Sequence, residues 1–397
     1  MNLRIQLDAL APSRTYWFCV FASSLGLTST LLLSIFCNMD SQIERSRNRA
    51  TVTEHIVEST AYTKYPGNYC GYNDVWNATV FKETCQVSIE DYHKGRTLEI
   101  DLMGISPAIA NAYRRIILAE VPTMAIEHCF IYNNTSVIQD EMLAHRLGMI
   151  PIKVDPTLFK WKSRKLGPEN TSREHTIVFK LKAKCEKKPK ADPEKTGLRS
   201  DLYDDYKIYT DKLEWEPLKD QTEKFLNGAI PQPVHKKILI AKLREKQELD
   251  IRLHAVKGIG RDHAKFSPVA TVAYRLMPDI KLKGKVTGEA AHRLKQSFSP
   301  GVVEIVGKEA KIVNARIDSG SRNHYRHTDL AEKVHYDLMK DHFIFKIESA
   351  GAIPAIDILL QASLILESKC EHFLKEVRET RSKKDNSGWS EWSMDTG

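Results

Sequence analysis

Few residues of this chain stand in a pattern that could do chemistry. The run Lys257–Gly260 resembles part of a phosphate-cradling loop but lacks the third glycine, and we predict a turn there. His145, Arg146 and His263 lie among apolar and small residues, where an imidazole can act as a general base. A histidine in such a place is more often a hydrogen-bonded structural residue, and we expect that role here. The chain also lacks hydrolase, zinc-protease, P-loop and kinase signatures, so we expect neither catalytic residues nor a cofactor.

The cysteines do not predict a metal site or a disulfide framework. There are seven, an odd number, and no two of them form a C-x-x-C pair. A cysteine-based zinc site needs clustered thiolates, which this spacing does not supply. Scattered cysteines fit a reducing compartment, where the side chain acts as a small buried hydrophobe. Their positions are 19, 37, 70, 85, 129, 185 and 370.

Composition and charge exclude several classes of protein. The 397 residues are 42% hydrophobic and 28% charged, which excludes a collagen-like, disulfide-scaffold or wholly disordered chain. The net charge is +8, and the stretch 160–200 alone holds 13 basic and 5 acidic residues. The remainder is therefore neutral, which argues against a uniformly basic nucleic-acid coat. A nucleic-acid site in the basic stretch stays open as a weaker alternative to a solvated face or a charged partner.

A second alternative is a secreted or membrane receptor. Tyr16–Cys37 is free of charge and long enough to span a bilayer, although serines and threonines dilute it. Near the other end, Trp389–Ser393 resembles the W-S-x-W-S box of class I cytokine receptors, and N-x-[ST] triplets begin at 77, 133, 134 and 170. The box lacks that family's surroundings, because it follows a charged helical segment. We therefore expect the box to be a coincidence. The segment 1–38 is either an anchor or an extension outside the working protein.

Hydrophobic periodicity predicts an α+β protein. Alternation, a continuous apolar run at 149–154 and β-branched residues at 269–276 predict strands. They are expected after Cys85 and at 98–102, 125–131, 149–154, 175–184, 269–276, 302–306 and 343–347. A helix over 107–119 should begin at the N-cap Ser106 with Pro107 in its first position. Shorter helices are expected at 140–147 and 288–298, and a mobile polar arm at 40–60.

The last predicted helix, 355–377, is the clearest element. Its apolar residues recur at helical spacing over about six turns and form one stripe. They are Ile356, Leu359, Leu366, Cys370, Phe373 and Val377.

Several long blocks together resemble RNA polymerase α and α-like subunits. The densest contains Asn111-Ala112-Tyr113-Arg114-Arg115. Blocks of this length in the right order are highly specific. They are Leu98–Leu102, Ala110–Leu118, Glu120–Ile126, Asn133–Ser136, Asp140–Pro151, Val256–Ala270 and Glu348–Pro354. Within the family, the chain most resembles the larger α-like subunits shared by polymerases I and III. Two features indicate this: the segment Tyr65–Tyr69, and the lack of the cysteine-rich loop of the polymerase II counterpart.

The resemblance implies an RNA polymerase α N-terminal-like fold with a discontinuous dimerisation domain and an inserted, mainly-β domain. The expected parts are an extension at 1–38, an arm at 39–85, dimerisation segments at 86–124 and 268–377, an insert at 125–267 and a flexible tail at 378–397. The two amphipathic helices would lie together in the dimerisation domain. A second α-like subunit would then bury their surplus apolar surface.

The resemblance further implies an assembly subunit that is not itself an enzyme. No D-x-D-x-D cluster is present to bind catalytic magnesium, which would lie on the largest subunit. The implied partners are the small α-like subunit and the second-largest and largest subunits of polymerases I and III, with DNA contacted only through the complex and no membrane. The implied location is the nucleus, in nucleolus and nucleoplasm. The expected partner-binding residues are Ile109, Ala112, Tyr113, Arg114, Arg115, Ile116, Ile356, Leu359, Leu366, Cys370 and Phe373, with Arg114 and Arg115 near the docking surface for the second-largest subunit.

Overall fold

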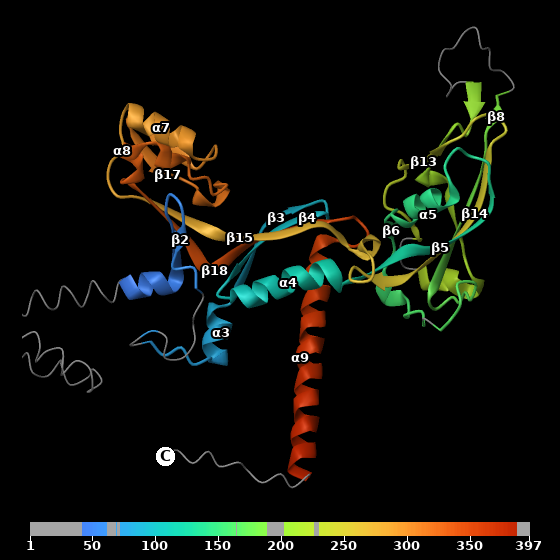
Figure 1. Ribbon diagram of the computed structural model, residues 1–397, viewed down its shortest axis with the longest axis horizontal. Coiled ribbons are helices and arrows are strands. Elements are labelled where there is room, and N and C mark those ends of the chain that lie inside the picture. The colour runs from blue at the N-terminus through green and yellow to red at the C-terminus, as the bar shows by residue number, and fades with distance from the viewer. Residues whose placement is uncertain are drawn as a thin grey trace, which may run out of the picture. The chain divides into compact units, whose positions relative to one another are not determined.

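The computed structural model describes residues 42–61, 69, 72–163, 165–188, 202–225 and 230–386 (Figure 1). The chain forms two compact units. One comprises Met1–Cys85 and Leu276–Phe343, and the other comprises Gln86–Arg275 and Ile344–Gly397, each over its described residues. Helices accompany antiparallel sheets in both units, so the predicted α+β class is confirmed.

The second unit contains the predicted dimerisation helices and the insert. Its helices are α4 (Pro107–Ala119), α5 (Asp140–Gly148) and α9 (Ala355–Asn386), with short turns of 3₁₀-helix at η1 (Pro156–Leu158), η2 (Thr210–Lys212), η3 (Lys219–Phe225) and η4 (Ala264–Phe266). Its strands are β3 (Gln86–His93), β4 (Thr97–Met103), β5 (Pro122–Asn134), β6 (Ile152–Lys153), β7 (Thr176–Lys184), β8 (Glu186–Lys187), β9 (Tyr203–Asp204), β10 (Lys207–Tyr209), β11 (Leu213–Glu216), β12 (Gln232–Pro233), β13 (Leu239–Lys242) and β14 (Glu248–Ile259).

The first unit is smaller and mixed. It contains β1 (Arg49–Val52), β2 (Val57–Glu58), α3 (Ala78–Thr84), α7 (Glu289–Ser297), β16 (Val303–Val306), β17 (Glu309–Ile312), η5 (Ala315–Ile317), η6 (Asn323–Arg326) and α8 (Thr328–Ala331). Two long strands, β15 (Val269–Leu282) and β18 (Val334–Ser349), contribute residues to both units. Strand β18 pairs with β1 and with β4.

The start of α4 follows the sequence signals closely. The Ser106 side chain accepts a hydrogen bond from the Ile109 backbone N–H at 3.3 Å, and Pro107 occupies the first turn. Both residues satisfy or remove backbone donors that a helix start leaves unpaired. The predicted helix boundaries 107–119 are therefore confirmed.

The insert is built on a four-stranded antiparallel sheet in the order β11-β7-β14-β5. Strand β14 pairs with β5 from Leu249 opposite Asn134 to Ile259 opposite Pro122, so the insert begins and ends at neighbouring positions. Helix α5 packs on this sheet through Leu143 and Leu147, both fully buried. The rest of this core consists of apolar strand residues, among them Ile177, Phe179, Leu181, Ile251 and Leu253.

The predicted turn at Lys257–Gly260 is wrong for its first three residues, which belong to β14. A Cβ on Gly258 would lie 2.5 Å from the Phe266 ring, and one on Gly260 would lie 2.2 Å from the Leu118 carbonyl oxygen. The Arg261 backbone N–H also donates to the Ala119 carbonyl at 2.9 Å. The two glycines therefore permit close packing between β14, a phenyl ring and the end of α4, which explains the pattern without a phosphate.

Two other predicted elements differ from the structure. Of the strand predicted at 149–154, only Ile152–Lys153 forms β6, where it pairs with β12. The last helix continues past its predicted end at Val377 to Asn386. Residues 1–38, the motif Tyr65–Asn68 and the Trp389–Ser393 box lie outside the described residues.

The predicted mobile arm at 40–60 is also wrong over the residues described. Strand β1 pairs with β18 through Arg49–Thr51, and Asp337 on β18 accepts hydrogen bonds from Arg45 at 2.9 Å and from Thr51 at 2.8 Å. The Lys340 ammonium donates to the carbonyls of Ser46 and Ala61 at 2.6 and 3.0 Å. Polar composition alone predicted an arm because these partners lie almost 300 residues away in the chain.

A histidine lies within the aromatic core of the first unit. His324 is fully buried and stacks on Phe298, with ring centroids 5.3 Å apart, and contacts Tyr325 and the edge of Tyr336. Neither ring nitrogen has a hydrogen-bond partner among the described residues. Burial lowers the pKa of His324 below its usual value of 6.5, and the nearby Asp318 opposes this only in part. The imidazole is therefore held neutral.

We predict that Gly260→Ala lowers the free energy of unfolding by about 1–3 kcal/mol, because its Cβ overlaps a backbone carbonyl that cannot rotate away. Gly167→Ala is the matched control, since no atom lies within 4 Å of its added Cβ. Urea denaturation followed by circular dichroism measures both variants. Equal stability of the two would show that the close contact has no energetic weight.

We predict that the first unit loses stability as the pH falls below about 6.5. The unfolded state takes up a proton on His324 there, whereas the folded state resists doing so until a lower pH. Thermal melts of the full chain between pH 7.5 and 5 should show a smaller decline in His324→Phe than in the wild type. The control is His55→Gln, since the His55 side chain is exposed. An unchanged decline in His324→Phe would contradict the assignment.

Candidate partner-binding surface

Helices α4 and α9 pack against each other, as the resemblance implied. In Figure 1 the long α9 crosses α4 and extends away from the neighbouring strands. The hydroxyl of Ser363 lies 3.4 Å from that of Tyr113, and Lys369 forms an ion pair with Glu120 at 2.5 Å. Ala110 and Ile117 of α4 are fully buried, as are Ile358 and Ala362 of α9. This contact fixes where the two helices present their remaining surfaces.

The predicted partner-binding residues fall into three levels of exposure. Ile116 is buried in the chain's own core. Half-buried positions are Ile109, Ala112, Tyr113, Arg114, Ile356, Leu359 and Leu366, whereas Arg115, Cys370 and Phe373 are exposed. The exposed and half-buried residues can contact a partner without a rearrangement. A partner role for the set stays a prediction.

The two adjacent arginines differ in their surroundings. The Arg114 guanidinium donates to the Asn111 side-chain oxygen through Nε at 3.2 Å and Nη2 at 2.8 Å, which holds it along the helix. Arg115 is exposed, and no carboxylate among the described residues pairs with it. A free guanidinium fork on a well-ordered helix suits a carboxylate on another chain.

The second half of α9 packs against nothing in the described structure. Every residue from Glu367 to Ser382 is exposed. Three of them are large and apolar: Phe373, Leu374 and Val377 are 69, 51 and 48% exposed. A lone helix of this length is marginally stable in water, and an apolar row on it is normally covered by another polypeptide.

The edge strand β3 carries a second uncovered apolar surface. Val87, Ile89 and Tyr92 lie opposite Leu102, Ile100 and Leu98 of β4, respectively. Cross-strand partners share one face of a sheet. The β4 residues of that face are buried, whereas the three β3 residues are 45–60% exposed. The core face of the sheet is therefore incompletely covered at β3.

Sequence reasoning predicted β3 as a strand but missed this surface. The alternation of Val87 and Ile89 with polar neighbours is the same for a buried and an exposed face. Only the strand pairing, which places β3 at the edge of the sheet, shows that its apolar face is uncovered.

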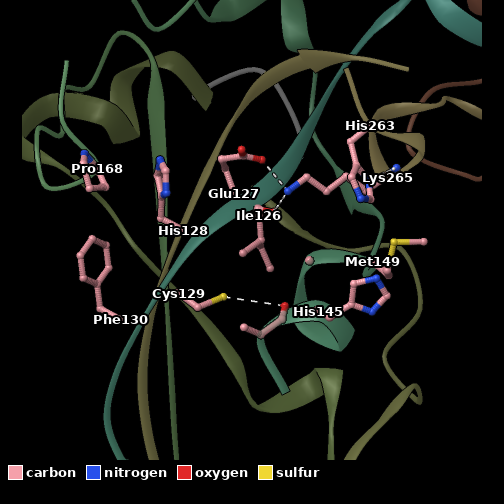
Figure 2. Close-up of a pocket in the computed structure, with 12 residues that line it drawn as sticks. Ile126, Glu127, His128, Cys129, Phe130, His145, Met149, Pro168, His263 and Lys265 are labelled. Atoms are coloured by element: carbon pink, nitrogen blue, oxygen red, sulfur yellow. Dashed lines mark hydrogen bonds and ion pairs between the residues drawn. The ribbon is translucent and has the colours of Figure 1, made fainter. Parts of the chain in front are cut away.

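The candidate histidines line a hollow of about 480 Å³ on the insert (Figure 2). His145 comes from α5 and His263 from the segment before η4, and both border the hollow together with His128 of β5. The His263 ring nitrogen Nδ1 accepts from the Lys265 backbone N–H at 3.1 Å, which caps η4. The Lys265 ammonium contacts Glu127 at 2.5 Å and the Ile126 carbonyl at 2.9 Å. His263 thus has the structural role that was predicted.

The thiol in this hollow is held in its protonated form. Burial raises the pKa of Cys129 to about 11, so the thiol is protonated at neutral pH. Its sulfur lies 4.0 Å from the Ala144 carbonyl oxygen (Figure 2). Across the described ranges no three histidine, cysteine or acidic side chains converge as metal ligands.

Carboxylates neutralise much of the basic stretch in the described structure. Lys182 pairs with Asp250 of β14 at 2.8 Å, Lys160 with Glu174 at 2.9 Å and Arg173 with Asp220 at 3.2 Å. Lys184 and Lys188 likewise contact Glu186 and Asp204. Charges already paired within the chain contribute little to binding phosphate, so this face favours the solvated interpretation over a nucleic-acid site.

Three asparagines of the N-x-[ST] triplets make hydrogen bonds within the described structure. Asn77 accepts from the Thr79 backbone N–H at 2.8 Å as the N-cap of α3, and the Asn134 amide donates to the Ile138 carbonyl at 2.9 Å. Asn133 donates to Glu248 on the paired strand. In the described part of the chain, every helix is too short or too polar to cross a membrane.

Packed helices with uncovered apolar surface, next to a sheet edge of the same kind, define a dimerisation module. The family model of the RNA polymerase Rpb3/Rpb11 dimerisation domain matches residues 99–370. The chain belongs to this family of RNA polymerase subunits.

Sequence similarity to known relatives covers most of the chain. It is 46% identical over 339 residues to mouse (Mus musculus) DNA-directed RNA polymerases I and III subunit RPAC1, covering 84% of this chain and 96% of that protein. The RPAC1 of Saccharomyces cerevisiae is 40% identical over 319 residues, with 80% and 94% covered. Subunit 3 of RNA polymerases II, IV and V from Arabidopsis thaliana is 31% identical over 295 residues, with 71% and 86% covered.

We predict that Cys129 resists alkylation whereas Cys370 reacts. Burial keeps the Cys129 thiol protonated at pH 8, and the Cys370 side chain is exposed on α9. Brief iodoacetamide treatment of the isolated native chain, followed by peptide mass spectrometry, gives the modified fraction at each site. Denaturation before labelling is the control and should make both react. Rapid native labelling of Cys129 would contradict its buried, protonated state.

Proposed function

We propose that this chain is a non-catalytic assembly subunit of DNA-directed RNA polymerases I and III. It pairs with the small α-like subunit and then docks the second-largest subunit, so that it supports synthesis of rRNA, 5S rRNA and tRNA. The observation that carries the proposal is the uncovered apolar surface of α9 and β3, in a chain similar over most of its length to RPAC1 subunits. Such a subunit acts in the nucleus, including the nucleolus.

The heterodimer interface proposed here combines the two surfaces. The row Leu366, Cys370, Phe373 and Val377 lies along one side of α9, because residues three and four apart share a helix face. A partner helix packed on this row would remove Phe373 and Val377 from water, and a second element would cover Val87 and Ile89 of β3. Obligate interfaces of this type are large and apolar, like a domain core divided in two.

Docking of the second-largest subunit is assigned to the exposed side of α4. Arg115 has an unpaired guanidinium there, and Arg114 is preoriented by Asn111. A carboxylate pair on the docking subunit would match this planar donor geometry. The chain contributes no catalytic group in this proposal. The Cys129 thiol is held in its protonated form, and His263 caps the short helix η4.

The test is co-expression of the full chain with the small α-like subunit, followed by affinity purification. We expect Phe373→Glu to weaken heterodimer formation at least about tenfold, since it places a charge in the centre of an apolar interface. Ser368→Glu is the matched control, because Ser368 is also exposed but does not belong to the row of Leu366, Cys370, Phe373 and Val377. Quantitative mass spectrometry of the recovered partner gives the result.

A further variant separates the two proposed steps. Arg115→Glu should leave the heterodimer intact and reduce recovery of the second-largest subunit from cells. Full recovery of the small subunit with Phe373→Glu would contradict the assigned interface. Absence of polymerase I and III subunits from the wild-type purification would contradict the function itself.

A further inference from the structure

Three neighbouring hollows border α5 on the insert, with volumes of about 480, 240 and 460 Å³. The first and second share His145 and Met149, and the second and third share Arg146, Leu239 and Ile240. We call this continuous surface the α5 groove. Because each hollow shares lining residues with the next, together they suit an elongated ligand better than a compact one.

The floor of the α5 groove is apolar and partly open to water. Met149, at the junction of the first two hollows, is 49% exposed, and Val137 in the third is 79% exposed. Flexible methionine side chains adapt to varied partners. Exposed apolar groups over a groove with polar borders mark an interaction surface.

The borders of the groove are cationic. Among the described residues, the second and third hollows are lined by Arg146, Lys242 and Arg244 and by no carboxylate. The Arg146 guanidinium donates to the carbonyls of Leu239 and Ile240 at 2.7 and 3.3 Å, which orders the side chain but leaves its charge uncompensated. In the first hollow, Lys265 is balanced by Glu127.

Strand register adds an independent sign of an anionic partner. Lys207 of β10 lies directly opposite Lys242 of β13, both are exposed, and neither forms an ion pair with any described residue. Like charges at paired positions destabilise a sheet. An acidic group bound between them would turn this repulsion into attraction.

We propose that the α5 groove binds an extended, acidic segment of a partner polypeptide. Apolar side chains of the segment occupy the hollows beside Met149 and Val137, and its carboxylates lie against Lys242, Lys207 and Arg244. Successive side chains of an extended chain point to opposite sides. A segment of alternating apolar and acidic residues can therefore place its apolar side chains in the hollows and its carboxylates against the basic side chains. The groove is separate from the α9 and β3 surfaces proposed for the heterodimer, and its test does not depend on that function.

Peptide binding to the full chain tests the proposal. Fluorescence anisotropy compares a labelled peptide of alternating Asp and Leu with one of alternating Lys and Leu. We expect the acidic peptide alone to bind, and Lys207→Glu with Lys242→Glu to weaken it at least about tenfold. Lys308→Glu with Lys311→Glu is the control, because it makes the same charge change at exposed lysines of the other unit. Equal binding of the two peptides, or equal weakening by both double variants, would overturn the proposal.

A crosslinking measurement covers the case in which a copurifying subunit already occupies the groove. A photoreactive amino acid replaces Val137 in the chain purified with its associated subunits, and mass spectrometry identifies the crosslinked peptide. A crosslink to a segment of another polypeptide rich in Asp or Glu supports the proposal. Crosslinks to this chain alone, to segments without acidic residues, or to none would overturn it.

Discussion

The end of α4 and Gly260 approach so closely that no side chain fits between them. A Cβ on Gly260 would overlap the Leu118 carbonyl, and the Arg261 N–H donates to the Ala119 carbonyl beside it. This contact lies where β14 ends, opposite the start of β5. The chain can therefore leave α4, form the whole insert and return to the same place. Both the continuity of the dimerisation elements and the position of the insert on them depend on this approach.

The same arrangement leaves apolar surface that the chain does not cover. The first turns of α9 use Ile358 and Ala362 to pack internally, whereas Phe373 and Val377 are exposed farther along the helix. The β3 edge repeats this pattern, with a buried row on β4 continued by an exposed row on β3. A chain that keeps such surfaces ordered is suited to association, because burial on a partner adds hydrophobic stabilisation without new folding.

Ion pairing, and not the number of basic residues in a segment, decides which cations of the insert are available to a ligand. The basic stretch around β7 contains the whole net charge of the sequence, yet Lys182, Lys160 and Arg173 each contact a carboxylate. Lys242 and Lys207 belong to less basic segments, but the register places them side by side without a carboxylate. Local charge density in a sequence is therefore a poor guide to which cations are available to a ligand, since strand pairing decides their neighbours.

The sequence by itself determined the α+β class, the boundaries of α4 and the existence of α5, α7 and α9. Helix caps and apolar periodicity act over a few residues, so their signals are complete within short segments. It also identified the family, through long ordered blocks around Asn111–Arg115 and Asp140–Pro151. Only the tertiary structure decided that Gly258 and Gly260 lie at close contacts, that residues near Thr51 join β18, and that Val87 and Ile89 are exposed. Each of these depends on partners far apart in the chain, where register and packing select one of many compatible arrangements.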